Sequence, residues 1–157
     1  MPRNQQEPSD GYGAAASSAD IMLVRAQFSQ LKGSEAGITD AFYTRLFEIA
    51  PELRPMFPAD LAGQGRKLMT TLAFAIGALD RPDVLAPAVR ELGTRHVGYG
   101  VTEAHFQPVA IALLETLSVR LGSDFEPRGR AAWTKAMAAL ASLMAEGMAL
   151  ANPSSIS

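Results

Sequence analysis

Apolar side chains recur at spacings of three and four residues along this chain, from Ile21 to Met144. That spacing places them on one face of a helix, because an α-helix completes a turn in about 3.6 residues. No segment shows the strict alternation of a strand, and no heptad pattern indicates a coiled coil. The sequence therefore predicts an all-α fold with about seven helices joined by short loops.

The length of 157 residues fits one domain, and a chain of this size buries roughly 70% of its unfolded surface. Residues 1 to 18 are rich in Gly, Ser, Pro, Asn and Gln and show no periodicity. We therefore predict a disordered tail over 1–18, a folded domain over 19–151 and a short C-terminal tail over 152–157.

Composition removes several classes of function. The 14 Lys and Arg residues nearly balance 16 Asp and Glu residues, so no electrostatic footprint for nucleic acid or an anionic membrane is present. The absence of cysteine excludes disulfides and thiolate metal sites. No signal peptide or membrane span is visible, which predicts a cytoplasmic protein. We find no catalytic triad, paired carboxylates or glycine-rich phosphate loop.

Capping and stop residues divide the periodic pattern into segments. Helices are predicted to begin at Asp20, Thr39, Asp60, Asp83, Thr102 and Pro127. Prolines at 51, 55 and 58 permit only short turns between the second and third of these helices, because each ring removes a backbone donor. Residues 51–58 should therefore form a corner.

Three polar side chains lie on the apolar stripes of separate helical segments: Tyr43, Gln64 and His96. Each has an ordinary explanation when taken alone, as a buried tyrosine, an exposed amide near a helix start and a satisfied core histidine. Together they indicate a haem pocket, in which an imidazole binds iron and two donors hold a ligand that gains negative character.

His96 continues the stripe of Leu85, Val89 and Leu92, so its ring is predicted to point inward. The carbonyl of Leu92, one turn earlier, lies where it could accept a hydrogen bond from the imidazole and fix its tautomer. His105 is expected to face solvent instead.

Two neighbouring residues suit the same pocket. Phe57 on the proline corner could lie flat against a porphyrin, and it could equally be a core aromatic. Lys67, three residues after Gln64, could meet a propionate at the pocket edge or simply be solvated.

The runs FYTRLFEIAPELRPMF, GQGRKLM, LGTRHVGYGV and AAWTKA resemble the globins. The similarity is greatest to single-domain bacterial globins and to the haem domain of flavohaemoglobins, with a relation to neuroglobin-like proteins. In those families the proximal histidine follows the distal residue by thirty-two positions, which is the spacing of Gln64 and His96.

The resemblance implies a three-over-three globin fold of seven to eight helices around one haem b, iron protoporphyrin IX. It makes His96 the proximal iron ligand and places Tyr43, Gln64 and Leu68 on the distal side. It also implies haem contacts from the following residues: Phe57, Lys67, Leu92, Val101, Phe106, Val109 and Met137.

Two departures separate this chain from flavohaemoglobins, which carry a tyrosine ten residues after the proximal histidine and a glutamate on the last helix. Here Phe106 and Met148 stand at those places, with Glu146 out of register. The sequence also shows no flavin or nicotinamide domain, so any catalytic turnover is expected to need an external reductase.

Three functions stay open at this point. The first is reversible binding of O2, and of NO or CO, for storage, delivery or scavenging. The second is an NO dioxygenase that depends on a reductase. The third is a gas sensor or a haem-free interaction module, and the presence of His96 with a polar distal side argues against the haem-free form.

Overall fold

The computed structural model describes residues 16–151. The predicted C-terminal tail over 152–157 and the first fifteen residues of the predicted tail over 1–18 lie outside that range. Within it the chain forms six α-helices and three short 3₁₀ helices, and no strand is present. In order they are α1 (Ser18–Gln30), α2 (Glu35–Ile49), η1 (Pro51–Met56), α3 (Leu61–Gly77), α4 (Pro82–Gly98), η2 (Glu103–His105), α5 (Phe106–Leu121), η3 (Gly122–Asp124) and α6 (Arg128–Ala151). The all-α prediction is confirmed.

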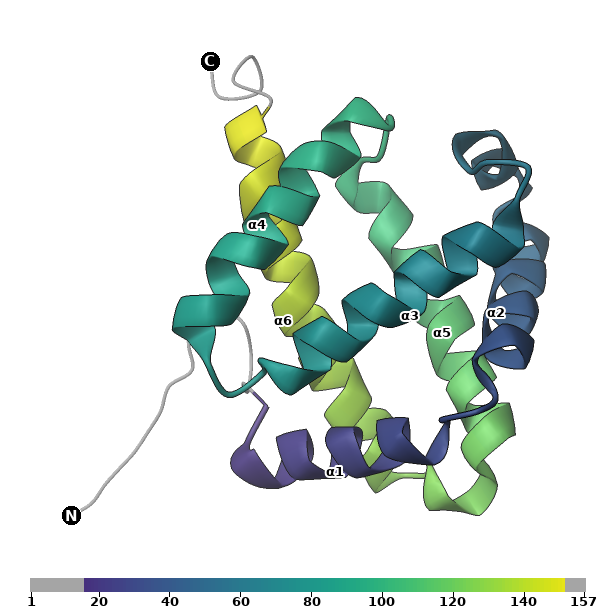
Figure 1. The fold of residues 1–157 in the computed structure, drawn as a ribbon, viewed down its shortest axis with the longest axis vertical. Coiled ribbons are helices and arrows are strands. Elements are labelled where there is room, and N and C mark those ends of the chain that lie inside the picture. The colour runs from purple at the N-terminus through teal and green to yellow at the C-terminus, as the bar shows by residue number, and fades with distance from the viewer. Residues whose placement is uncertain (1–15, 152–157) are drawn as a thin grey trace.

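The helices pack in crossed pairs (Figure 1). α4 lies against α6, α2 packs on both α5 and α3, and α1 packs on α6. In Figure 1, α3 and α4 cross in front of α5 and α6 and diverge from the corner that joins them. The main buried cluster draws mostly on α1, α2, α5 and α6, with Leu53 from η1 and Ile76 from the end of α3, so these four helices form the base on which α3 and α4 rest.

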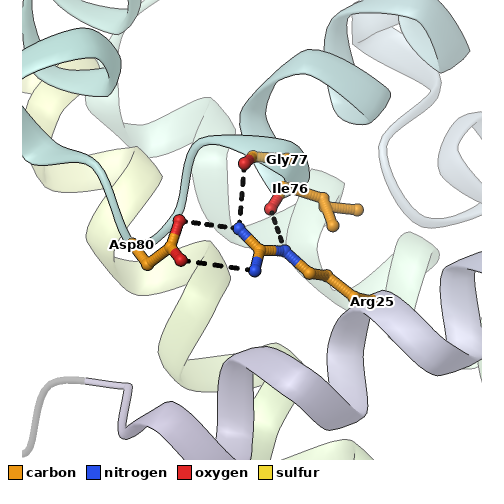
Figure 2. Close-up of polar contacts among 4 residues, drawn as sticks. All are labelled: Arg25, Ile76, Gly77 and Asp80. Carbon is orange, nitrogen blue, oxygen red and sulfur yellow. Dashed lines mark hydrogen bonds and ion pairs between the residues drawn. The ribbon is translucent and has the colours of Figure 1, made fainter.

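Arg25 on α1 clamps the corner between α3 and α4 (Figure 2). Its guanidinium donates to the carbonyls of Ile76, at 3.2 Å, and Gly77, at 2.8 Å, and pairs with the carboxylate of Asp80 at 2.8 Å. The last carbonyls of a helix have no partner within the helix. Arg25 therefore caps α3 and fixes the point from which α4 departs.

The structure corrects two predicted boundaries. The second helix begins at Glu35 and not at Thr39, because Thr39 is buried on α2 and its hydroxyl donates back to the Glu35 carbonyl at 3.2 Å. Threonine hydroxyls commonly make this bond inside helices. The predicted tail also ends too late: Ser17 caps α1 by accepting from the Asp20 amide, and Ser18 is already helical.

Residues 51–58 form the short corner that the prolines predict, as the 3₁₀ helix η1 followed by an extended Phe57. Between residues 16 and 151, no helix has the length and hydropathy needed to cross a membrane.

Candidate functional site

The crossing of α2 and α3 brings two of the predicted polar residues to the same region. A Cβ atom on Gly65 would lie 2.6 Å from the Thr39 hydroxyl oxygen, so α3 approaches α2 closely at this point. Thr39 lies one turn before Tyr43 on the same face of α2, and Gln64 immediately precedes Gly65. The crossing therefore places Gln64 and Tyr43 within the same part of the molecule.

Tyr43 is buried, with 3% of its surface exposed. Its ring packs edge-on against Phe57 at 5.5 Å and Phe42 at 5.0 Å, and it stacks with Phe47 at 6.1 Å. Among residues 16–151, its hydroxyl has no hydrogen-bond partner, and burial raises the pKa of this phenol to about 12. A buried hydroxyl without a partner is costly and calls for an explanation.

The α3 residues on this side are only partly covered. Gln64 is half-buried, and its side-chain amide makes no hydrogen bond to any described residue. Leu68, one turn later, is half-buried and packs against the main core cluster. Lys67 is exposed, as expected for a residue at the edge of a pocket.

A small internal cavity lies behind Leu68. Its volume is about 10 Å³, which is about the space that one water molecule needs. Two of its lining side chains carry a polar group, and both groups are already hydrogen-bonded: the Thr39 hydroxyl bonds to the α2 backbone, and the Trp133 indole N–H donates to the Gln27 side-chain oxygen at 2.9 Å. A water there would lack the two to four polar partners that hold buried water. The interior next to Leu68 is therefore apolar and dry.

His96 lies on the last turn of α4 and is half-buried. Its Nδ1 lies 2.6 Å from the carbonyl oxygen of Leu92, the partner expected from the sequence. A carbonyl can only accept, so Nδ1 carries the proton and Nε2 is left with a free lone pair. This is the form of imidazole that binds a metal.

α4 is held rigidly on α6. A Cβ on Gly93 would overlap the Met144 backbone carbonyl, and a Cβ on Gly147 would overlap that of Arg90. The Thr94 hydroxyl also donates to the Gly147 carbonyl at 3.0 Å. The two backbones are in contact at Gly93, three residues before His96. This contact fixes the position and direction of the His96 side chain relative to α6.

His105 differs from the expectation that it faces solvent. It is half-buried, and its Nδ1 accepts a hydrogen bond from the Thr102 amide at 3.0 Å. It therefore stabilises the 3₁₀ turn that stands between Thr102 and α5, because an unpaired amide at a helix start needs an acceptor.

The other predicted pocket residues come from separate elements and share one property: each is apolar and only partly buried. They are Leu92 on α4, Val101 in the loop after it, Phe106 and Val109 on α5, and Met137 on α6. Val109 and Met137 pack against the same core cluster as Leu68 and Phe57.

On the last helix, Met148 is buried and Glu146 is not directed at the imidazole. The Glu146 carboxylate pairs with the Arg90 guanidinium at 2.7 Å, with both side chains partly in solvent. His96 consequently has a neutral carbonyl as its hydrogen-bond partner, where a glutamate would make the ring more electron-rich.

These features fit a haem. The imidazole of His96 offers one free nitrogen, and the buried Tyr43 hydroxyl lacks an acceptor. Apolar side chains from α3, α4, α5 and α6 are incompletely covered by protein. A flat apolar group with a central metal and a small polar ligand would satisfy all three.

Comparison with known proteins agrees with this class of protein, a helical haem-binding domain. The sequence model of the globin family matches residues 40–144. An anaerobic nitrite reductase of rice (Oryza sativa subsp. indica) is 30% identical over 132 residues, which cover 80% of this chain and 91% of that protein. The chain belongs to the globin family.

Two further proteins are similar to this chain. A flavohemoprotein of Bordetella parapertussis is 33% identical over 126 residues, covering 78% of this chain and 31% of that protein. The chain thus spans about a third of that relative. A solved structure, an engineered carbene transferase based on a proposed nitric oxide dioxygenase of Rhodothermus marinus, matches with a TM-score of 0.79 and 27% identity, over 91% of this chain and 100% of that one. The globin fold is confirmed, and the family implies a haem cofactor.

No packing role was predicted from the sequence for Thr39 and Gly65, which meet where α2 and α3 cross. A signal was present, because glycine in the middle of a helix is unfavourable and usually has a packing reason. No role was predicted from the sequence for Tyr99 either, whose ring contacts that of His96.

Proposed function

We propose that this globin binds one haem b through His96 and holds a diatomic gas, O2 above all, against Tyr43 and Gln64. The observation that carries the proposal is the buried Tyr43 hydroxyl, which has no acceptor among the described residues. A donor buried among three phenylalanine rings, without an acceptor among residues 16–151, is suited to a ligand that brings its own acceptor.

The chain's own residues would divide the work as follows. The haem, when bound, supplies the iron that bonds the gas. His96 binds the iron through Nε2 while the Leu92 carbonyl holds its Nδ1 proton. Tyr43 and Gln64 donate hydrogen bonds to the ligand, and Leu68 and Phe57 keep water away from it.

The remaining residues would hold the porphyrin. Lys67, which is exposed, would pair with a propionate at the solvent edge. Partly buried apolar residues would contact the ring; they are Leu92, Val101, Phe106, Val109 and Met137. NO and CO would enter the same site. The expected roles are storage, delivery or scavenging of O2 in the cytoplasm.

A second candidate function is NO dioxygenation, and the likeness to a flavohemoprotein over 78% of the chain favours it. This reaction joins NO and O2 into nitrate and consumes one electron each time, so it would need a reductase, which we propose is a partner protein. The carbonyl partner of His96 and the outward Arg90–Glu146 pair leave the imidazole less electron-rich, which supports gas binding as the main role.

The histidines provide the experiment for haem binding. His96→Ala should lose stable haem, as measured by the Soret band of the purified protein, and His105→Ala should keep it. The His105 variant is the matched control, since its ring is bonded to the Thr102 amide. Retention of a normal haem spectrum by His96→Ala would overturn the proposal.

Gas storage and NO dioxygenation are separated by turnover. NO consumption by the O2-loaded protein should stop after one equivalent without a reductase. Sustained consumption of NO over many equivalents with a purified flavoprotein reductase would favour the dioxygenase. A rate that stays near zero with the reductase would favour gas binding alone.

A further inference from the structure

Tyr99 is a large aromatic residue that the protein leaves in solvent. Its side chain is 60% exposed, more than that of Phe74, the other strongly exposed aromatic among the described residues. No hydrogen bond holds its hydroxyl to any residue between 16 and 151. Core packing and polar pairing therefore do not account for its position.

Within the described part of the chain, the one aromatic contact of Tyr99 is with His96. The ring centroids lie 5.6 Å apart, and the ring planes are inclined at 70°. This is an edge-to-face arrangement, which aromatic rings favour because the positive edge of one meets the negative face of the other. Tyr99 follows His96 by three residues, so both side chains share one face of the helix end.

The backbone keeps Tyr99 in this place. Tyr99 ends α4, and its amide donates to the His96 carbonyl at 3.0 Å. The next residue, Gly100, has a φ of 86°, a left-handed conformation that glycine adopts without strain and that turns the chain away from the helix. A Cβ on Gly100 would lie 3.7 Å from the Met56 methyl carbon, so η1 supports this turn from the other side.

We propose that Tyr99 is a positioning residue that sets the orientation of the His96 ring about its own axis. This inference rests on the proposed role of His96 as the iron ligand. The Leu92 carbonyl restrains one ring nitrogen, at 2.6 Å. With this hydrogen bond alone, the His96 ring could still tilt about the line from Nδ1 to the carbonyl oxygen. The edge-to-face contact with Tyr99 restrains that tilt from a second direction.

The orientation of a proximal imidazole matters because Nε2 must point at the iron. A ring held in one orientation before the haem enters loses less entropy on binding. Tyr99 therefore contributes to haem retention and to the strength of the bond between His96 and iron, without touching the gas ligand.

The test uses the ferrous, unliganded, haem-loaded protein and follows the iron–histidine stretching band by resonance Raman spectroscopy. Tyr99→Ala should shift or broaden this band and raise the rate of haem loss to a haem-free acceptor globin by about two- to tenfold, the range expected for one edge-to-face aromatic pair. Tyr99→Phe keeps the ring and should behave like the wild type.

Phe74→Ala is the matched control, because Phe74 is also an exposed aromatic, 44% exposed, and lies on α3. It should leave both the band and the haem loss unchanged. An unchanged band in Tyr99→Ala, or the same change in Tyr99→Phe, would overturn the inference.

A second measurement separates this inference from the proposed function. In the haem-free protein, the NMR signals of the His96 ring should shift and broaden in Tyr99→Ala but not in Phe74→Ala. This readout does not depend on iron. If the His96 signals change in Tyr99→Ala while His96→Ala still binds haem, the proposed function fails and the contact between Tyr99 and His96 stands. If the His96 signals do not change while His96→Ala loses haem, only the role of Tyr99 fails.

Discussion

α4 and α3 carry the two halves of the candidate site, and the protein holds them in different ways. α4 meets α6 backbone to backbone, at Gly93 and Gly147, and Thr94 adds a hydrogen bond across the same crossing. α3 approaches α2 most closely at Gly65, which faces the Thr39 side chain and not the α2 backbone, near Gln64.

The far end of α3 is held by the Arg25 clamp on Ile76, Gly77 and Asp80, shown in Figure 2. Between these two attachment points, Leu68 and Leu72 are only partly buried. α4 is therefore held on α6 by backbone contacts, whereas the closest contacts of α3 are to the side chains of Thr39 and Arg25. Under the proposed function, α4 would carry the iron ligand and α3 would lie beside the gas, where side-chain contacts can adjust more easily than backbone contacts.

The largest effect on the free energy of unfolding should come from the α4–α6 crossing. Gly93→Ala would place a methyl group on the Met144 carbonyl, and overpacking of this kind costs typically ~1–3 kcal/mol of unfolding free energy. Gly65→Ala on α3 should cost less, because the Thr39 side chain can shift more easily than the α6 backbone.

Urea unfolding of the haem-free protein measures both changes. Gly98→Ala is the control on the same helix, since no atom lies within 4 Å of its added Cβ, and it should be neutral or slightly stabilising. A greater loss in Gly65→Ala than in Gly93→Ala would contradict the contrast between the two helices.

The distal half is tested by O2 release. Tyr43→Phe removes a hydrogen bond to a partly charged acceptor, a loss of ~1.5–3 kcal/mol, so release should be on the order of ten to a hundred times faster. Gln64→Leu should act in the same direction by a smaller factor, because its amide is less buried than the tyrosine. Rapid mixing with CO gives the rates. The release of CO is the control, because bound CO carries less negative charge than bound O2. Equal effects of the substitution on the release of both gases would contradict hydrogen bonding as the cause.

Alkaline pH tests the burial of Tyr43. Its pKa is raised by burial from 10.0 to about 12, so the folded state favours the neutral phenol. That stability is complete below pH 10 and is lost as the pH rises toward 12. At pH 11 the loss is about 1.4 kcal/mol, one pKa unit. Tyr43→Phe should lack this component of the alkaline decrease when urea midpoints are compared from pH 8 to 11. An identical decrease in both proteins would show that Tyr43 is not buried in solution.

The smallest effect should come from the Arg25 clamp. The hydrogen bond from Arg25 lowers the pKa of Asp80 from its usual 3.8, so the charged carboxylate is favoured in the folded state. The contribution is present above pH 3.8 and disappears as the pH falls below the lowered value. The pair is exposed, and salt should weaken it.

Asp80→Asn should therefore be slightly less stable than the wild type at pH 6 and equal to it at low pH. Hydrogen exchange should quicken at the end of α3, near Ile76, and stay unchanged around Gly93 on α4. Faster exchange around Gly93 would show that the clamp also holds the α4–α6 crossing.

The sequence alone determined the helical class and the polar residues that interrupt the apolar stripes, Tyr43, Gln64 and His96. Periodicity makes this possible, because a side chain's place on a helix face follows from its residue number. The start of α2 predicted from the sequence was four residues too late. Thr39 is of a type that often caps helices, but here it is buried and its hydroxyl bonds within the helix.

Only the tertiary structure decided how these faces meet. The overlap of Gly93 with the Met144 carbonyl, the approach of Gly65 to Thr39 and the pairing of Glu146 with Arg90 join residues far apart in sequence. The contact of Tyr99 with His96 spans three residues, yet it depends on the turn at Gly100 and on support from η1. Helix periodicity is a local property, whereas the choice of neighbouring helix depends on burying all the apolar faces at once.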